Sequence, residues 1–255
     1  MPFSFAHPVA VLPIKQKWKK YFNLTGLVLG SIAPDFEYFI RFKPEAVIGH
    51  DLTGFFLLNL PLCIFVAFLF HKLIKKPLIL CLPVPFDKWY EYLAAKDWKI
   101  NSSKEMLIFI YSSLVGMFTH VFWDAFTHES GKFVVLFSVL SKEIDFMDYS
   151  IPIYKFLQHG STLIGGLAVL VCIFRIRRDN SQANSLPARY KLLYFITILS
   201  FGFILVLSGL YFSLIKFSFD NRGVIVVTFI NGIILGSLFI SCIINRMIAN
   251  KCNKA

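Results

Sequence analysis

The sequence predicts an all-α fold, a polytopic membrane helical bundle with five or six transmembrane helices. Of the 255 residues, 56% are hydrophobic and only 16% are charged, whereas an ordinary soluble domain carries about 25% charged residues. The mean hydropathy is +0.65. A soluble core of this size could not bury so many apolar side chains, but a lipid-facing bundle can expose them. The second observation is a series of apolar runs that approach the length of about 20 residues needed to cross a bilayer as a helix.

Four of these runs meet the length requirement well. They cover residues 54–71, 160–176, 191–215 and 223–244. Two weaker runs, 106–127 and 24–40, also carry ionisable residues, which in membrane proteins face the bundle interior. Because proline has no N–H, we expect a helix to kink or end at Pro34 in the second weak run. Whether residues 24–40 cross the membrane or only re-enter it decides between six helices and five.

The distribution of polar residues divides the chain into three parts. Residues 1–176 hold nearly all the ionisable residues that lie within or beside apolar runs, and they form the predicted metal-site-bearing membrane helical domain. Residues 177–190 are a flexible polar loop with the sequence RRDNSQANSLPARY. Residues 191–255 form a C-terminal transmembrane helix pair.

The net charge of +11 points to a membrane surface rather than to nucleic acid. The basic residues gather at the ends of the apolar runs, as they do on the cytoplasmic side of membrane helices. Membrane lipids with anionic headgroups are therefore the expected partner, and no nucleic acid is expected. The same rule predicts a multi-pass protein of the cell membrane whose C-terminus is cytoplasmic, together with the loops 77–104 and 177–190. Segments 41–53 and 128–158 then face outward.

The strongest local pattern is a polar stripe formed by His120, Asp124 and His128. Residues four apart lie on the same face of a helix, so two imidazoles and one carboxylate stack above one another. Nitrogen and oxygen donors in this arrangement suit zinc or another divalent metal. The alternative is a hydrogen-bonded histidine–aspartate pair that only holds helices together.

Four other positions offer metal ligands, and each has a structural alternative. Asp35 follows a proline in the block Gly30–Glu37, and aspartate is also common at turns and helix ends. His50 precedes a strong apolar run, at a place where chains often cap a helix. His159 lies at another helix entrance, and His7 lies near the N-terminus; both are as readily interfacial.

The predicted topology brings these patterns together, and it rests on lysine and arginine alone. It places six of the candidates near the outer membrane face: Asp35, His50, His120, Asp124, His128 and His159. The position of His7 depends on how the N-terminus threads. Because ionisable residues at membrane depth are costly, they mark functional sites by default. We therefore expect one metal site at the outer face.

Four blocks of the sequence resemble a known family. They are MPFSFAHP at residues 1–8, GSIAPDFEYF at 30–39, HVFWDAFTHESG at 120–131 and QHGS at 158–161. Together they are similar to the uncharacterised membrane family called domain of unknown function 4184, over roughly residues 1–165. This resemblance implies a membrane protein but no particular activity.

A looser resemblance concerns the order of histidines and aspartates. The series His, Pro-Asp, Gly-His, His-x-x-x-Asp, His, His is similar to that of the zinc-dependent phospholipase C family and of related membrane-bound metal-dependent hydrolases. That resemblance implies seven metal ligands: His7, Asp35, His50, His120, Asp124, His128 and His159. Leu163 stands four residues after His159, where those phospholipases have glutamate. The resemblance therefore implies one or two zinc ions rather than three, with Glu37 or Glu129 as the substitute carboxylate.

Three functions are open at this point. The first is a metal-dependent hydrolase of phosphoester substrates, including lipid-linked ones, with a phospholipase-C-like site at the extracytoplasmic face. Asp35 would be its base or bridging ligand, and Glu37 a second catalytic carboxylate. The second is a metal-ion or proton transporter, although the last three apolar runs carry almost no ionisable residues at depth. The third is a non-catalytic membrane scaffold with a structural metal.

Overall fold

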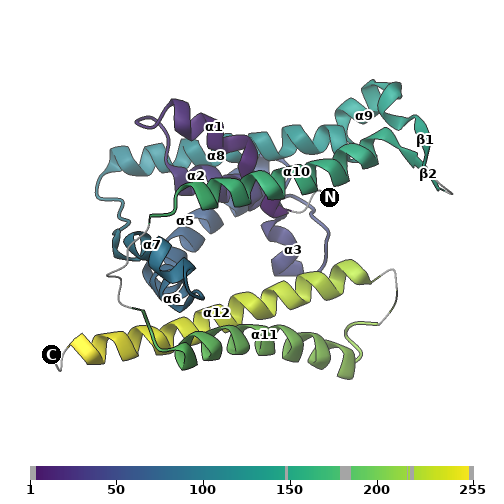
Figure 1. Cartoon of the computed structure of the whole chain (residues 1–255). Helices are drawn as coiled ribbons and strands as arrows, with labels where there is room; N and C mark the ends of the chain where they lie inside the picture. The colour runs from purple at the N-terminus through teal and green to yellow at the C-terminus, as the bar shows by residue number, and fades with distance from the viewer. Residues whose placement is uncertain (1–3, 147–148, 179–184, 217, 219–220, 253–255) are drawn as a thin grey trace. The chain divides into compact units, whose positions relative to one another are not determined.

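The computed structural model of the chain is almost entirely helical, as the sequence predicts (Figure 1). It describes residues 4–146, 149–178, 185–216, 218 and 221–252. Within this part of the chain, five helices are long and apolar enough to cross a membrane: Leu52–Cys81, Ser103–Leu136, Ile153–Arg175, Ala188–Tyr211 and Arg222–Asn250. The all-α polytopic class is therefore confirmed, with the smaller of the two expected helix counts.

The chain forms two compact units. The first combines Met1–Phe36, Val47–Ile64 and Ile100–Ile176, and the second combines Glu37–Ala46, Phe65–Lys99 and Arg177–Ala255. The last segment of the first unit ends at Ile176. The second unit also takes in two earlier segments, which a division along the sequence cannot show.

The first unit contains the N-terminal helices and a small hairpin, in which β1 and β2 pair antiparallel. Its elements are η1 (Ser4–Ala6), α1 (Pro8–Lys17), α2 (Leu24–Ile32), η2 (Ala33–Asp35), α4 (Leu52–Gly54), η3 (Phe55–Asn59), α8 (Ser103–Thr127), α9 (Lys132–Leu136), η5 (Ser138–Ser141), β1 (Glu143–Phe146), β2 (Tyr149–Pro152) and α10 (Ile153–Arg175). Helix α5 (Leu60–Leu69) continues from this unit into the second. The second unit contains α3 (Phe36–Arg41), η4 (Phe70–Ile74), α6 (Lys75–Cys81), α7 (Phe86–Ala95), α11 (Ala188–Tyr211) and α12 (Arg222–Cys252).

Residues 24–41 form three short helices instead of one span. The Asn23 side chain caps α2 by accepting a hydrogen bond of 3.0 Å from the Gly26 backbone N–H. The helix ends after only nine residues, where Pro34 lies in the 3-10 turn η2. Because proline cannot donate the next helical hydrogen bond, the break falls at the position expected from the sequence. It leaves Asp35 at the end of the turn, between α2 and α3.

Prolines also shape the long helix Leu52–Cys81. Its π-helical segments η3 and η4 each precede a proline, Pro61 and Pro77. Pro77 cannot donate to the carbonyl of Leu73, four residues earlier, and the Asn245 side chain donates to that oxygen instead at 2.9 Å. The helix therefore continues past the run 54–71 expected from hydropathy.

Helices α2 and α8 pack with almost no space between their backbones. A Cβ atom on Gly30 would lie 2.1 Å from the Ser113 carbonyl oxygen, and one on Gly116 would lie 2.5 Å from the Leu27 oxygen. Only glycine allows this approach, which is typical of helix pairs in membranes. The contact fixes the end of α2 against the C-terminal half of α8.

In the second unit, α11 and α12 lie side by side along their lengths (Figure 1). A Cβ atom on Gly232 would lie 2.5 Å from the Phe201 carbonyl oxygen, so this pair also meets through glycine. The buried hydroxyls of Tyr194 and Ser241 lie 3.2 Å apart across the pair. This unit has its own apolar core around Tyr194 and Ile240.

Candidate metal centre

The close packing of α2 on α8 brings His120 beside Asp35. The His120 side chain is fully buried, and its Nδ1 lies 2.7 Å from the backbone oxygen of Ser31 in α2. A carbonyl oxygen can only accept, so Nδ1 donates its proton to Ser31 and Nε2 is the ring nitrogen left to face the carboxylates. That Nε2 lies 3.6 Å from Asp35 Oδ1 and 3.3 Å from Asp124 Oδ2.

His7 approaches the same centre from the start of α1. Its ring stacks on the ring of His120, with 3.9 Å between centroids and 17° between planes. Its Nε2 lies 3.7 Å from Asp124 Oδ1. Burial, and next the charge of His120, lowers the pKa of His7 to about 4, so the ring is neutral at pH 7.

His50 closes the cluster from the loop before α4. Its Nε2 lies 3.7 Å from Asp35 Oδ1 and 3.6 Å from Asp124 Oδ2. The loop is held by Asn59, whose buried side chain donates to the Gly49 carbonyl at 2.7 Å. The His50 side chain keeps 29% of its surface exposed, so the cluster reaches solvent on this side.

Asp35 is the most enclosed carboxylate of the cluster. The Ser4 hydroxyl donates to its Oδ2 at 2.5 Å. Burial by itself raises the pKa of Asp35, but the attraction of His120 and the hydrogen bond from the Ser4 hydroxyl outweigh it. The pKa therefore lies below its usual value and the group is a carboxylate at neutral pH.

Several polar atoms in this cluster are buried without a hydrogen-bond partner among the described residues. They are His7 Nε2, His120 Nε2, Asp35 Oδ1 and Asp124 Oδ1. Leaving such atoms unpaired costs free energy, because each has given up its water. All four belong to two groups of side chains whose donor atoms lie within 4.8 Å of one another: His7 with His120 and Asp124, and Asp35 with His50 and His120.

The distances within the cluster fit a divalent ion. Ligand atoms about 2.0–2.2 Å from one zinc in a tetrahedral arrangement lie roughly 3.3–3.6 Å apart. The five histidine-to-aspartate distances among these side chains run from 3.3 to 3.7 Å. The Nδ1–H of His120 is held by a backbone carbonyl, an outer-shell contact that orients metal-binding histidines.

The other predicted site residues have different surroundings. His128 belongs to neither group: its Nδ1 lies 3.1 Å from the Asp124 backbone oxygen and 3.7 Å from Asp124 Oδ1. His159 is exposed on α10 and belongs to neither group, whereas its neighbour Gln158 is buried. The carboxylate of Glu37 accepts a hydrogen bond of 2.6 Å from Arg41 Nε. Glu129 is exposed.

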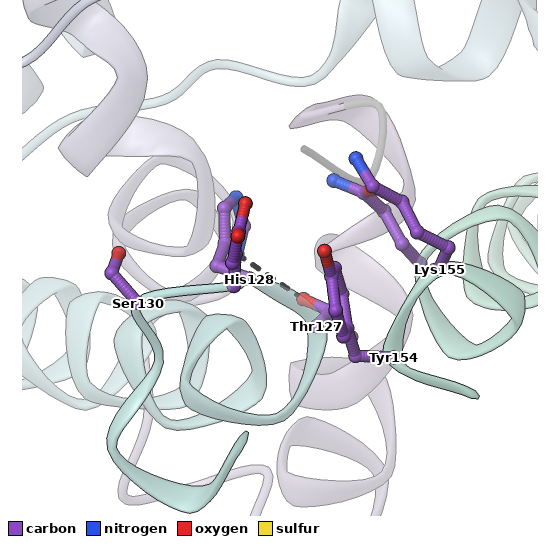
Figure 2. A pocket seen from close by; sticks show the side chains of 7 residues that line it. Thr127, His128, Ser130, Tyr154 and Lys155 are labelled. Atoms are coloured by element: carbon purple, nitrogen blue, oxygen red, sulfur yellow. Dashed lines mark hydrogen bonds between the residues drawn. The ribbon is translucent and has the colours of Figure 1, made fainter. Parts of the chain in front are cut away.

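His128 instead stands at the edge of an open polar cavity of about 530 Å³. Figure 2 shows His128 and Lys155 on opposite sides of this cavity, with Thr127 and Tyr154 between them. The Thr127 hydroxyl lies 3.3 Å from His128 Nδ1. No pattern in the sequence marks Lys155. Ser4 lies in the block MPFSFAHP, but its hydrogen bond to Asp35 joins residues 31 apart along the chain, which the sequence does not indicate.

These features define a helical protein with five candidate membrane spans and a buried histidine–aspartate cluster in its first unit. A family model described as domain of unknown function (DUF4184) matches residues 1–242, and the chain belongs to that family. The match extends well beyond the four blocks that carry the resemblance in the sequence. No curated protein and no solved structure matches the chain. The comparisons therefore give the looser resemblance to zinc-dependent phospholipases C no support.

Proposed function

We propose that the protein is a metal-dependent hydrolase of phosphoesters whose site holds one or two divalent ions, with zinc as the first candidate. The observation that carries this proposal is the convergence of four buried donor atoms that lack hydrogen-bond partners among the described residues. A cation would satisfy these atoms and balance the two carboxylates Asp35 and Asp124. Neutral imidazoles and carboxylates are the ligands that zinc prefers in catalytic sites.

The proposed ligands are His7, Asp35, His50, His120 and Asp124. Both groups of donors share His120, and its single available nitrogen can bind only one ion. Two ions would therefore need a bridging carboxylate, and among the proposed ligands Asp35 lies within 3.7 Å of two histidine nitrogens and Asp124 of three. A single ion would use up to five of these donors.

The proposed reaction is the attack of water on a phosphoester. A bound divalent metal would lower the pKa of its water molecule to about 7 and would polarise a phosphoryl oxygen. The water oxygen forms a bond to phosphorus, and the phosphorus–oxygen bond to the alcohol breaks. Asp35 is either a bridging ligand or the base that accepts the water proton, and that proton ends on the leaving alcohol.

The position of the cluster favours a substrate at a membrane face. His50 lies two residues before the candidate span Leu52–Cys81, and Asp124 lies in the last turn of α8. These are the two helix ends for which the distribution of lysine and arginine predicts the extracytoplasmic side. Chemistry at that depth suits a phosphoester carried by, or linked to, a lipid.

The test uses full-length protein purified in detergent, stripped with a chelator and reloaded with zinc, manganese or magnesium. We expect metal to bind and to restore hydrolysis of bis(4-nitrophenyl) phosphate. Asp35→Asn should lower turnover at least a hundredfold. If the loaded protein binds metal but hydrolyses no phosphoester, the hydrolase proposal is wrong.

Two other results would assign a different function. Uptake of the metal into proteoliposomes, blocked by His120→Ala, would make the cluster part of a transport path. A large rise in thermal stability on metal loading, with neither turnover nor uptake, would identify a structural ion.

A further inference from the structure

We infer that the molecule bound at this site is a membrane lipid with a phosphate-bearing head, whose chain lies in an apolar groove between α1 and α10. This inference rests on the proposed function, since it names the substrate class of the same site. It comes from two hollows of opposite character, one lined by His7 and the other by His128, and both of these histidines lie 3.7 Å from Asp124 Oδ1.

The first hollow is an apolar groove of about 310 Å³ in the first unit. Its walls include Ala6, Val9 and Ala10 from the N-terminal segment and Ile164 and Gly165 from α10. Residues 6, 10 and 165 are alanine, alanine and glycine. Because these residues are small, they leave a space between the helices that larger side chains would occupy. A Cβ atom on Gly165 would lie 3.0 Å from the Ala6 Cβ, so the helices approach closely at one edge of the groove.

This groove opens toward lipid. Helix α10 is a candidate membrane span, and only 11% of its most apolar window is buried inside the structure. Ile164, on the wall of the groove, is 70% exposed. A hydrocarbon chain from the surrounding bilayer could therefore enter without crossing water.

The groove meets the histidine–aspartate cluster at His7. His7 lines the groove with one part of its ring, while another face of the ring stacks on His120. Trp123, directly before Asp124, also lines the groove. A chain lying there would end beside a proposed metal ligand.

The second hollow is the polar cavity beside His128 (Figure 2). Lys155 offers a cation, and Ser130, Thr127 and Tyr154 offer hydroxyl groups that can donate to phosphate oxygens. One carboxylate, that of Glu129, also lines this cavity. The cavity therefore suits a head with an anionic group and further polar atoms.

Asp124 separates the two hollows. Its Oδ1 lies 3.7 Å from His7 Nε2 on the groove side and 3.7 Å from His128 Nδ1 on the cavity side. A lipid with its chain in the groove and its head in the cavity would place the ester phosphate at the cluster. This arrangement gives the two hollows one shared occupant.

The test is photolabelling of zinc-loaded, full-length protein in phosphatidylcholine nanodiscs, with hexadecylphosphonate carrying a diazirine near the end of its chain. The carbon–phosphorus bond is not hydrolysed, so binding is read without turnover. We expect labelled peptides from residues 8–17 and 153–166, and a loss of at least fivefold when excess unlabelled hexadecylphosphonate competes. A hexadecanol probe with the same diazirine should not be enriched at these peptides.

Two enlarged variants provide a matched pair. Ala10→Phe, on the groove wall, should lower this labelling at least fivefold while metal content stays at the wild-type level. Gly166→Phe should leave it unchanged, because a Cβ atom at this position has no neighbour within 4 Å. Uniform labelling of all lipid-facing helices, insensitive to competitor and to Ala10→Phe, would overturn the inference.

The results also separate the inference from the proposed function. Specific labelling in a protein that hydrolyses no phosphoester would support the lipid site and refute the hydrolase. Hydrolysis of a water-soluble phosphodiester with no specific labelling would refute the lipid site and leave the hydrolase standing.

Discussion

His120 Nδ1 lies 2.7 Å from the carbonyl oxygen of Ser31, and this contact ties the chemistry of the cluster to the packing of α2 on α8. The hydrogen bond holds the imidazole in the tautomer whose Nε2 faces Asp35 and Asp124. Because both partners are fully buried, the ring can keep this orientation only while the two helices stay in close contact.

The first prediction follows from that contact. Gly30→Ala should destabilise the protein by about 2 kcal/mol or more and lower metal affinity at least tenfold, because its Cβ would lie 2.1 Å from the Ser113 oxygen and push α2 away from α8. Thermal unfolding in detergent and metal titration measure the two effects. Gly166→Ala is the control, since no atom lies within 4 Å of its Cβ. Equal behaviour of the two variants would contradict the role given to this packing.

A second prediction separates His128 from the proposed ligands. His128 belongs to neither group of converging donors, and its Nδ1 faces the Asp124 backbone oxygen. His128→Ala should therefore retain metal, whereas His120→Ala should lose both metal and turnover. Metal content by mass spectrometry and phosphodiester hydrolysis are measured on the same samples. Loss of metal from His128→Ala would return His128 to the ligand set that the sequence predicts.

Much of the fold can be predicted from the sequence because lipid imposes a simple rule. Apolar runs of sufficient length mark the spans, and Pro34 marks the break that removes 24–40 from them. The π-helical segments before Pro61 and Pro77 could not be predicted, because the continuation of that helix depends on partners such as Asn245.

Likewise, only part of the candidate site can be predicted from the sequence. The four-residue spacing of His120 and Asp124 predicts a shared helix face, and both side chains do lie on the buried face of α8. His159 shows the limit of that reasoning. Neighbouring residues on a helix point in directions that differ by about 100°. In α10 the buried residue is Gln158, so its neighbour His159 is exposed. The residues from 160 to 166 differ too little in polarity to show which face of the helix is buried.

A third prediction concerns the second unit, where Lys191 Nζ and the Ser185 hydroxyl each donate to Asp87 Oδ2 at 2.5 Å. Lys191→Met should destabilise the protein by about 3 kcal/mol at pH 8, because it leaves a buried carboxylate without its cationic partner. Thermal unfolding in detergent checks this value. The double variant Asp87→Asn, Lys191→Met should recover most of the loss, and failure to recover would contradict the assignment to the ion pair.

The same pair gives a pH dependence with a definite sign. Burial raises the pKa of Asp87, but the hydrogen bonds from Lys191 and Ser185 outweigh it and hold the pKa below its usual value. In the wild type, the stabilisation is therefore complete above about pH 4 and is lost as the pH falls through the lowered pKa. In Lys191→Met the pKa of Asp87 is higher than in the wild type, because the hydrogen bond from Lys191 is gone, so the deficit should shrink as the pH falls from 8 to 3. A constant deficit over that range would contradict this explanation.

The fourth prediction concerns orientation. Lysine and arginine clusters follow the apolar runs that end near residues 71, 176 and 245, so the C-terminus should be cytoplasmic. With five spans, the cluster would then lie at the extracytoplasmic face. A green fluorescent protein fused after Ala255 should fluoresce, and an alkaline phosphatase fusion at the same place should be inactive. The opposite pair of results would move the site to the cytoplasmic face.

The central claim is that His120 and Asp124 hold a metal ion together with His7, Asp35 and His50. The most direct measurement is the metal content of detergent-purified protein, compared with that of the double variant His120→Ala, Asp124→Ala and of His71→Ala, whose ring stacks on Trp98 in the second unit. We expect one or two equivalents of a divalent metal in the wild type and in His71→Ala, and none in the double variant. Stoichiometric metal in the double variant, or none in the wild type after loading, would contradict it.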